Sequence, residues 1–362
     1  MKDKYILNTI RLIYKMPFPE YANRGLTGLT NVGNSCYLNS CMQVLSHTYE
    51  LNDFLKKGEY KKKLNRVPDS VILLEWDKLR ELMWSTNCTV APHGFVKTIR
   101  KVAAMKNREI FTGHDQNDVQ EFLLFLVDAF HTALSREVDM QINGQMQTDT
   151  DKLAIVCYTM MKNMYKKEYS EMLNIFYGIH VSEIVSKTGE TLSAMPEPFS
   201  VLSLSLPNME KEKTTLYDCF DLYCEPEQLS ASNGNAWFND KTQQKEDAQR
   251  RISFWSLPNI LIIDLKRWNG HTRKNHNRID IPLKDADFSK YVKGYNAASY
   301  KYDLFGVCNH GGGAQGGHYT AYIKNANGKW YEFNDTLVKE INEIDVISPQ
   351  SYCLFYRKRI IK

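Results

Sequence analysis

The stretch GLTNVGNSCYLNS, residues 28–40, places a cysteine between a turn rich in glycine and asparagine and the start of a helix. Gly33 and Asn34 suit a tight turn that leaves the thiol of Cys36 accessible. The N–H groups at a helix N-terminus favour the thiolate, which is the form of cysteine that attacks. The apolar positions that continue at helical spacing are Leu38, Cys41, Met42 and Leu45. The stretch therefore predicts a helix that begins at a reactive cysteine.

A side-chain amide stands five residues before this cysteine, at Asn31. From there it can reach back over the turn and donate to an oxyanion beside the backbone N–H of Cys36. One donor of this kind contributes about 2.7–4 kcal/mol to a transition state. These residues alone leave an alternative open, because a cysteine at the start of a helix also serves as a small buried apolar side chain.

Outward from this stretch, the pattern is mainly helical over about residues 25–130. A second helix is predicted in DVQEFLLFLVDAFH, residues 118–131, and Asp115 is expected to cap its start. Its apolar face comprises Val119, Phe122, Leu123, Leu126 and Phe130. After a polar loop at residues 136–150, another helical stretch is predicted at about 151–176. The first part of the chain is therefore expected to be helical.

The pattern changes to short β-type runs at about residue 180, with Gly, Pro and Asn between them. The predicted strands are IHVSEIVS (179–186), FSVLSLSL (199–206), NILIIDLKRW (259–268), YDLFGVCNH (302–310), HYTAYIK (318–324), KWYEFND (329–335) and YCLFYRK (352–358). A helical part followed by a strand-rich part implies an α+β fold, with an active site between the two.

A cysteine nucleophile needs a histidine base, and GGHYTAYIKNANGKWYEFND, residues 316–335, offers one within a predicted β-hairpin. Opposed residue numbers in such a hairpin sum to a constant, and a turn centred on Ala326 makes that constant 652. His318 then faces Asn334 at a Cβ separation of about 4.5–5.5 Å, close enough for an amide oxygen to bond an imidazole N–H. Because the turn centre is defined only to within one residue, Asp335 is a second candidate for this partner. A structural pair is the alternative, but together with the cysteine the pattern favours Cys-His-Asn catalysis.

Composition narrows the class of protein. The 362 residues are 43% hydrophobic and 24% charged with a net charge of +4, as in a globular protein with a sizeable core. We interpret the basic stretch at residues 56–66 as a solvated surface, and nucleic acid is not an expected partner because its binding motifs are missing.

No apolar run approaches the roughly 20 residues of a membrane span, and residues 1–20 lack the apolar core of a signal peptide. Eight scattered cysteines fit reduced thiols, which predicts a cytoplasmic and/or nuclear location.

These segments together resemble the ubiquitin-specific protease family. Residues 28–40 resemble its cysteine box, with Ser35 where Thr is usual, and GHDQNDVQEF (113–122) resembles its Gln-x-Asp-x-x-Glu-Phe segment. GGHYTAYIK and KWYEFND resemble its histidine box. The remaining similar segments are LPNILIIDLKRW (257–268), RKNHNRIDIPL (273–283) and YDLFGVCNHGGG (302–313). The likeness runs from about Gly25 to Lys358, and the motifs occur in the family's order.

The resemblance implies a papain-like hand with a helical thumb, β fingers and a β palm. The expected ranges are an N-terminal extension at 1–24, the thumb at 25–175, the fingers at 176–255 and the palm at 256–362. It also implies thiol-dependent hydrolysis of the bond after the C-terminal Gly of ubiquitin, through an acyl-enzyme. Cys36 is then the nucleophile, His318 the base, Asn334 the third member with Asp335 as alternative or support, and Asn31 the oxyanion donor.

The same resemblance assigns the substrate contacts. Asp118 matches the family's acid that pairs with an arginine in ubiquitin's tail, and Gln116 and Glu121 are expected to line the same channel. Gly316 and Gly317 suit a narrow passage for a thin substrate end, and Tyr319, in the same histidine box, is a further expected contact. The implied partners are ubiquitin and ubiquitinated proteins, with a monomeric enzyme that needs no cofactor. Two other readings remain, a protease for a ubiquitin-like modifier and an inactive ubiquitin-binding scaffold.

The chain departs from the family where zinc is often bound at the fingertips. The positions of the two Cys-x-x-Cys pairs fall on Val185, Thr188, Phe238 and Lys241. None of these is a normal zinc ligand, so no structural zinc is expected. Two cysteines nearby, Cys219 and Cys224, make only a weak metal site without further ligands.

Overall fold

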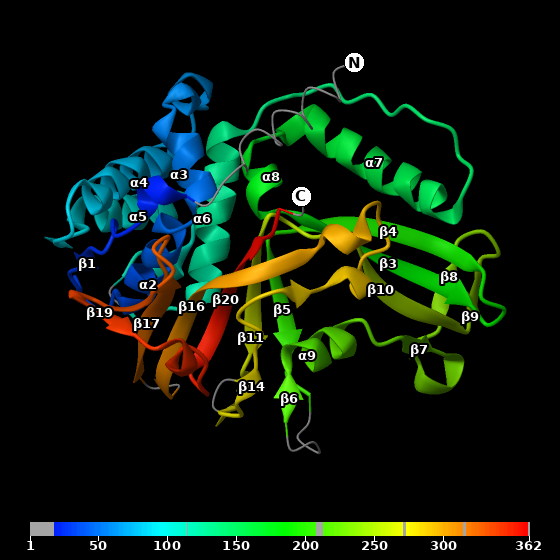
Figure 1. The fold of residues 1–362 in the computed structure, drawn as a ribbon. Helices are drawn as coiled ribbons and strands as arrows, with labels where there is room; N and C mark the ends of the chain where they lie inside the picture. Colours follow the sequence, from blue (N-terminus) through cyan, green and yellow to red (C-terminus); the bar gives the residue numbers. More distant parts are fainter. Residues whose placement is uncertain (1–17, 114, 208–212, 271–272, 314–315, 361–362) are drawn as a thin grey trace.

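The helices of the first part of the chain gather beside the larger sheet (Figure 1), and the molecule has the predicted α+β class. The computed structural model describes residues 18–113, 115–207, 213–270, 273–313 and 316–360. The helices that precede the sheets are α2 (Cys36–Ser46), α3 (Tyr49–Lys56), α4 (Pro68–Ser85), α5 (His93–Met105), α6 (Val119–Leu134), α7 (Asp149–Glu168) and α8 (Met172–Phe176). Among the described helices, none combines the length and the apolar character that crossing a bilayer requires.

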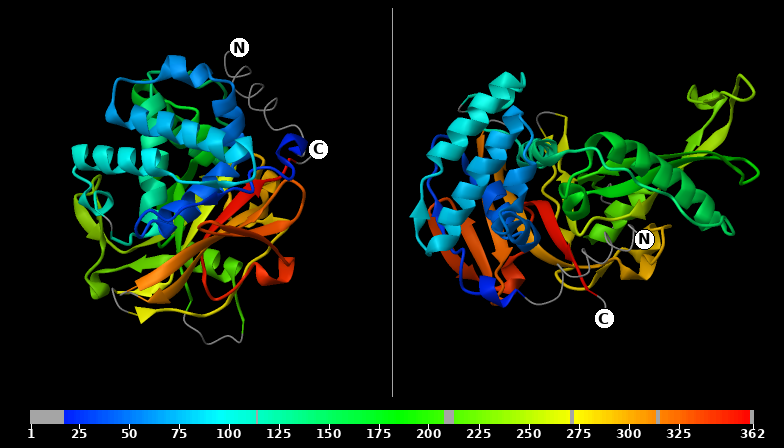
Figure 2. Two further views of the ribbon diagram at one scale, coloured as in Figure 1. Left: turned by 90° about the vertical axis from the view of Figure 1, so that its left-hand side faces the viewer. Right: turned by 90° about the horizontal axis from the view of Figure 1, so that it is seen from above.

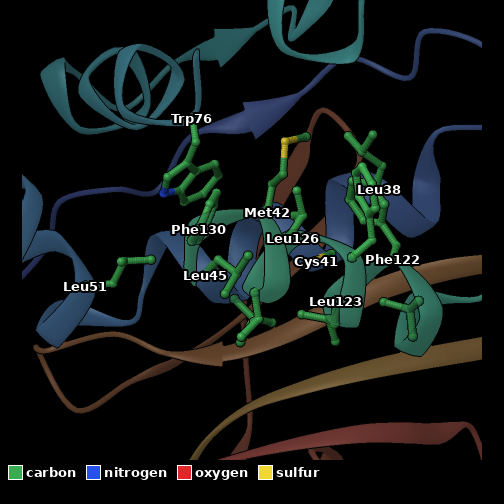
Figure 3. Packing of buried hydrophobic residues seen from close by; sticks show 14 of the residues in the cluster. Leu38, Cys41, Met42, Leu45, Leu51, Trp76, Phe122, Leu123, Leu126 and Phe130 are labelled. Atoms are coloured by element: carbon green, nitrogen blue, oxygen red, sulfur yellow. The ribbon is translucent and has the colours of Figure 1, made fainter. Parts of the chain in front are cut away.

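Helix α2 lies at the centre of the helical part, in contact with both α6 and the larger sheet. Every residue from Cys36 to Ser46 is buried. The side chains labelled on these two helices in Figure 3 are Leu38, Cys41, Met42 and Leu45 of α2 and Phe122, Leu123, Leu126 and Phe130 of α6. Full burial of one such large apolar side chain contributes about 1.5–3 kcal/mol. The helix that begins at Cys36 is therefore held on all sides by the core.

The predicted cap of α6 is wrong by three residues. Asp118, not Asp115, is the N-cap, and its carboxylate accepts the backbone N–H of Gln120 at 2.7 Å. Its backbone is extended (φ −75°, ψ 134°), so the helix begins at Val119. Asp115 lies in the turn before, where its carbonyl oxygen accepts the side-chain amide of Asn117. The carboxylate of Asp118 therefore stands at the positive end of the helix.

The helical stretch predicted at 151–176 is divided into α7 and α8. Thr148 and Asp151 form a capping box that starts α7, as their exchanged hydrogen bonds show. Tyr169 ends it, because its backbone is extended and pairs with Arg136 in an isolated bridge. The polar loop predicted at 136–150 leads the chain away from Arg136, and α7 returns it to this bridge.

The larger sheet has the strand order β19-β18-β17-β16-β20-β11-β5, and β15 pairs with β16. Its strands are β5 (Val201–Ser205), β11 (Ile260–Lys266), β15 (Ala286–Asp287), β16 (Lys301–Gly313), β17 (Gly316–Lys324), β18 (Trp330–Asn334), β19 (Leu337–Ile341) and β20 (Ser351–Lys358). Every run that the sequence predicted as a strand overlaps a strand of the structure. FSVLSLSL contains the end of one strand and the whole of another, since Phe199 closes β4 and Val201 opens β5.

The hairpin β17–β18 has a register different from the predicted one. Ala321 faces Phe333, so opposed residue numbers sum to 654 and the turn is centred one residue later than expected, on Asn327. A shift of two leaves each side chain on its predicted face. His318 and Asn334 therefore share a face of the sheet, but they meet diagonally rather than directly.

The smaller sheet has the order β4-β3-β10-β7. Its strands are β3 (Gly178–Ser186), β4 (Thr191–Phe199), β7 (Glu227–Leu229) and β10 (Ala248–Ser256), and β8 (Trp237–Asn239) pairs with β9 (Gln244–Glu246) beside it. Helix α7 packs on one face through Ala154 and Cys157. Figure 2 shows this part projecting away from the other helices.

The expected fingers, residues 176–255, are not one continuous structural part. They include β5, which runs parallel to β11 in the larger sheet, and α9 (Leu216–Tyr223), which packs against β5. Strands of the smaller and the larger sheet therefore alternate along the chain in this range.

The end of the expected N-terminal extension packs on the helical part. The ring of Tyr21, in the 3-10 turn η1 (Pro19–Tyr21), stacks on Tyr49 with centroids 4.5 Å apart, and its hydroxyl donates to Asp53 at 2.6 Å. Residues 1–17 lie outside the described residues. Further on, β1 (Gly28–Leu29) pairs in parallel with β2 (Thr89–Val90).

Candidate active site

The two predicted catalytic segments meet where α2 packs on β17. Cys36 is the first residue of α2 and is 3% exposed. Its thiol accepts a hydrogen bond from the backbone N–H of Tyr319, the residue that follows His318 in β17. The fold thus brings the cysteine next to the histidine strand, although the two are far apart in the sequence.

Burial raises the pKa of the Cys36 thiol, and the Asp335 carboxylate acts in the same direction. The backbone N–H groups of Tyr319, Tyr37 and Cys36 itself lower this pKa but do not outweigh burial. The helix N-terminus therefore lowers the pKa of the thiol, as predicted, but burial raises it by more. At neutral pH the free protein holds a neutral thiol, so attack requires a base that takes its proton.

His318 is exposed and bonded to Asn334, with its Nε2 atom 2.7 Å from the amide Oδ1. Because an amide oxygen only accepts, the Nε2 atom carries the hydrogen in the neutral ring. The Nδ1 atom then bears the lone pair of a base. The arrangement is that of a histidine whose tautomer is set by an asparagine.

Asp335 does not take the place of Asn334 but supports a different residue. Its backbone is left-handed (φ 49°), and its carboxylate accepts the side-chain amides of Asn31 at 3.0 Å and Asn39 at 2.7 Å. Its carbonyl oxygen accepts the backbone N–H of Leu29 at 2.8 Å. Of the two candidates, Asn334 is the one bonded to His318, and Asp335 anchors the loop before Cys36.

The amide of Asn31 is oriented from both ends. Its Oδ1 atom accepts the backbone N–H groups of Gly33 at 3.1 Å and Ser35 at 3.2 Å, and its Nδ2 atom donates to Asp335. An amide nitrogen carries two hydrogens, so one remains for a substrate. The structure thus provides a fixed donor beside the cysteine, and the oxyanion role stays a prediction.

The predicted substrate residues lie where the segment before α6 meets the sheet. The side-chain amide of Gln116 donates to the carbonyl oxygen of Gly317 at 2.9 Å and accepts its backbone N–H at 3.0 Å. Asp118 is half-buried and accepts the hydroxyl of Tyr352 in β20. Partial burial, followed by the charge of Asp118, raises the pKa of Glu121 in the first turn of α6. Two carboxylates in one turn favour a cation at this end of the helix.

The side chain of Tyr319 is not placed for its predicted substrate contact. It is 6% exposed, and its ring packs against His310 with centroids 4.5 Å apart. The residue offers its backbone N–H to Cys36 instead.

Sequence reasoning missed a group of buried charged residues near this site. The ammonium of Lys274 lies 2.7 Å from His310 Nδ1, and burial lowers the pKa of Lys274 to about 8 and that of His310 to about 4. Burial, with the charge of Asp118 next, raises the pKa of Asp264 in β11 to about 7. The sequence does contain a sign of this group, because Asp264 stands inside the apolar run ILIIDLK, residues 260–266.

The two glycines before His318 differ in what surrounds them. A Cβ atom at Gly317 would lie 2.2 Å from His310 Nε2 and 2.8 Å from the carbonyl oxygen of Gly311, whereas one at Gly316 would have no atom within 4 Å. We expect Gly317→Ala to lower the free energy of unfolding by about 1–3 kcal/mol, as overpacking does. Gly316→Ala is the matched control and should unfold like the wild type. Denaturant titration measures both, and equal stability of the two variants would contradict the packing described.

Hydrogen bonds hold the tip of the smaller sheet. The carboxylate of Asp247 accepts the ammonium of Lys187 and the backbone N–H of Ala231, each at 2.9 Å. Cys219 is buried in an apolar cluster and donates to the carbonyl oxygen of Thr215. Within the described ranges, no group of three or more His, Cys, Asp and Glu side chains is placed to hold a metal ion. A fingertip without zinc remains a prediction.

A family model described as ubiquitin carboxyl-terminal hydrolase matches residues 27–356. Among curated relatives, ubiquitin carboxyl-terminal hydrolase Usp2 of Drosophila melanogaster is 32% identical over 343 residues, which cover 93% of this chain and 35% of that protein. Ubiquitin carboxyl-terminal hydrolase 2 of Homo sapiens is 29% identical over 341 residues, 92% of this chain and 55% of that protein. The Gallus gallus protein of the same name is 31% identical over 344 residues, 92% and 93% of the two chains. The chain thus spans about a third of the fly protein and about half of the human one.

Solved structures share the fold. The SAGA Ubp8/Sgf11/Sus1/Sgf73 DUB module bound to ubiquitin aldehyde matches with a TM-score of 0.70 at 24% identity, over 94% of this chain and 71% of that chain. A further structure of the same module matches with a TM-score of 0.64 at 23% identity, over 94% of this chain and 70% of that chain. The fold shared with these structures therefore covers nearly the whole chain.

Proposed function

The chain belongs to the ubiquitin carboxyl-terminal hydrolase family, and from this membership and the geometry of its site we propose that it is a cysteine-type deubiquitinase. It hydrolyses the isopeptide or peptide bond after the C-terminal Gly of ubiquitin. The observation that carries the proposal is the meeting of three parts at one point. The Cys36 thiol is bonded to the strand of His318, His318 to Asn334, and Asn31 is fixed in the loop before the cysteine.

In the first half of the reaction, Nδ1 of His318 takes the thiol proton and the Cys36 sulfur attacks the carbonyl carbon of the terminal Gly. The backbone N–H of Cys36 and the amide of Asn31 donate to the oxyanion. His318 then gives its proton to the departing amine, which leaves a thioester on Cys36. In the second half, His318 takes a proton from water, the water oxygen attacks the thioester, and the thiol is regenerated.

Each supporting residue has a distinct part in this scheme. Asn334 holds the histidine ring with the lone pair on Nδ1, as the 2.7 Å bond to Nε2 requires. Asp335 holds Asn31, and its negative charge adds to burial, the larger effect, in raising the pKa of the Cys36 thiol. Pre-positioned donors of this kind need no reorganisation when charge develops on the substrate.

We expect Asp118→Asn to raise KM for ubiquitin substrates about five- to tenfold with little change in kcat. Asparagine is as good an N-cap as aspartate, so α6 should persist while the negative charge is lost. The loss weakens a charge-assisted bond to a basic residue of the substrate tail, which acts in binding rather than in chemistry. Steady-state kinetics measure the two constants.

Asp128→Asn is the matched control, because Asp128 is an exposed carboxylate on the same helix. It should behave like the wild type. A fall in kcat alone for Asp118→Asn would refute a role in tail recognition.

Hydrolysis of ubiquitin that carries a fluorogenic C-terminal amide tests the proposal. Ubiquitin is expected to be cleaved faster than each ubiquitin-like modifier with the same leaving group. Faster cleavage of another modifier would support the second reading, a protease for that modifier. Binding of ubiquitin without hydrolysis would overturn the proposal in favour of a scaffold.

We further propose that the protein acts on ubiquitinated proteins in the cytosol or the nucleus. All eight of its cysteines are free. Such thiols persist in reducing compartments, where disulfides are rare.

A further inference from the structure

A basic pocket of about 340 Å³ lies against the loop that leads to Cys36. One wall is Val32 of that loop, and the other is a face of α5 formed by His93, Val96, Lys97 and Arg100. None of the described residues that line it is acidic. The first turn of α5 also carries no acidic residue, and the helix dipole makes that end positive.

The pairing of β1 with β2 places the pocket beside the catalytic loop. The two strands run in parallel, and the backbone N–H of Thr30 donates to the carbonyl oxygen of Val90 at 2.9 Å. Parallel strands end at the same edge, so the loop after β1 and the start of α5 after β2 lie next to each other. The pocket residues recur at helical spacing along α5, which puts them on one face of the helix.

The pocket borders the proposed oxyanion donor. Val32 is the next residue after Asn31, and its backbone N–H donates to the hydroxyl of Ser35 at 2.9 Å. The charge of Arg100 lowers the pKa of Tyr37, the residue after Cys36, although burial raises it more. The field of the pocket therefore reaches the first turn of α2.

The residues proposed to hold the ubiquitin tail belong to other segments. Asp118 caps α6 and bonds Tyr352 of β20, and Gly317 lies in β17, bonded to Gln116. None of these contact residues lines the pocket, which is formed by α5 and by Val32, the neighbour of Asn31. Because the tail contacts and the pocket are built from different residues, a tail held at α6 leaves the pocket open to the protein on the other side of the scissile bond.

We propose that this pocket binds an acidic side chain of the leaving protein, close to the lysine that carries ubiquitin. The inference rests on the proposed function and names the class of substrate that the same site prefers. Lys97 is exposed, and Arg100 stands on the same face, so a carboxylate that enters meets two cationic side chains. An exposed ion pair contributes about two- to fivefold in affinity, and a pocket with more than one cation should reach the upper end of that range.

The test uses ubiquitin joined by an isopeptide bond to the central lysine of three synthetic peptides of equal length. Their flanking residues are all Glu, all Gln or all Lys. We expect the wild type to cleave the Glu peptide with a kcat/KM about fivefold above that of the Gln peptide, and the Lys peptide most slowly. Raising the salt concentration should reduce this preference, because the Debye length falls from about 10 Å at 0.1 M to about 3 Å at 1 M.

Lys97→Glu should remove the preference for the Glu peptide or invert it. Lys101→Glu is the matched control, since Lys101 is exposed one turn further along α5 and does not line the pocket. It should keep the wild-type order of the three peptides.

Equal kcat/KM values for the three peptides, or an equal loss of preference in both variants, would overturn the inference. The Gln peptide separates this result from a failure of the proposed function. Its cleavage by the wild type supports the deubiquitinase whatever the preference, and cleavage of none of the three would overturn both proposals.

Discussion

Cys36→Ala is expected to abolish hydrolysis, with kcat lower by at least about 10⁴-fold, while ubiquitin still binds. Removal of the nucleophile leaves only the contribution of oxyanion donors and substrate positioning, which cannot form the acyl-enzyme. Binding should persist because the side chain is 3% exposed and offers a ubiquitin tail little surface. Alanine is also a good helix former, so α2 should be retained. Steady-state hydrolysis and ubiquitin binding by calorimetry measure the two effects.

The matched control is Cys88→Ala. Cys88 is the exposed free cysteine of the chain, whereas the sulfur of Cys36 is held by the N–H of Tyr319. The control should keep wild-type hydrolysis. Turnover retained by Cys36→Ala would show that another group forms the intermediate.

His318→Ala is expected to lower kcat by about 10³-fold or more and to change the pH dependence of the remaining rate. Because burial raises the pKa of Cys36, the variant holds a neutral thiol at pH 7 and has no base to ionise it. Its rate should then rise about tenfold for each pH unit between 7 and 9, as hydroxide takes over the deprotonation. A pH series of kcat/KM measures this slope.

Asn334→Ala provides a graded comparison. It removes the bond that fixes the histidine tautomer but leaves the base in place, so its loss should be smaller than that of His318→Ala. A loss of kcat as large as that of His318→Ala would be at odds with an orienting role for Asn334. A flat pH profile for His318→Ala would contradict the raised pKa of the thiol.

Local patterns were sufficient for the elements that carry the chemistry. The spacing of Leu38, Cys41 and Leu45 predicted a helix after Cys36, and the structure has that helix with those residues in the core. Short β-type runs in the C-terminal part predicted the strands of the larger sheet except β15 and β19. Side chains alternate between the faces of a strand, and this alternation predicted that His318 and Asn334 share a face. The observed register differs from the predicted one by two residues, and a shift of two leaves each side chain on the same face.

Contacts between distant segments were beyond local patterns. Asp335 was weighed as a partner for His318, yet it bonds Asn31, which lies 304 residues away in the chain. The balance that sets the pKa of Cys36 also depends on burial, and burial is a property of the whole fold rather than of the cysteine box. Asp115 was preferred as the helix cap on spacing, but the extended backbone of Asp118 decides where α6 begins.

The division of strands between the two sheets was also beyond local patterns. The change of pattern at residue 180 marked the first strand correctly, since β3 starts at Gly178. It could not show that β5 leaves the smaller sheet to pair with β11, because parallel pairing between distant strands has no local signature. The alternating burial of β5 suits an outer strand of either sheet.

The most direct test of Cys36 as the nucleophile is the reaction of the purified protein with ubiquitin that bears a thiol-reactive group at its C-terminus. The proposed mechanism predicts a covalent adduct of one ubiquitin per chain, mapped by mass spectrometry to Cys36, formed equally by Cys88→Ala and absent from Cys36→Ala. An adduct on another residue, or an adduct that persists in Cys36→Ala, would contradict the assignment of the nucleophile and with it the proposed mechanism.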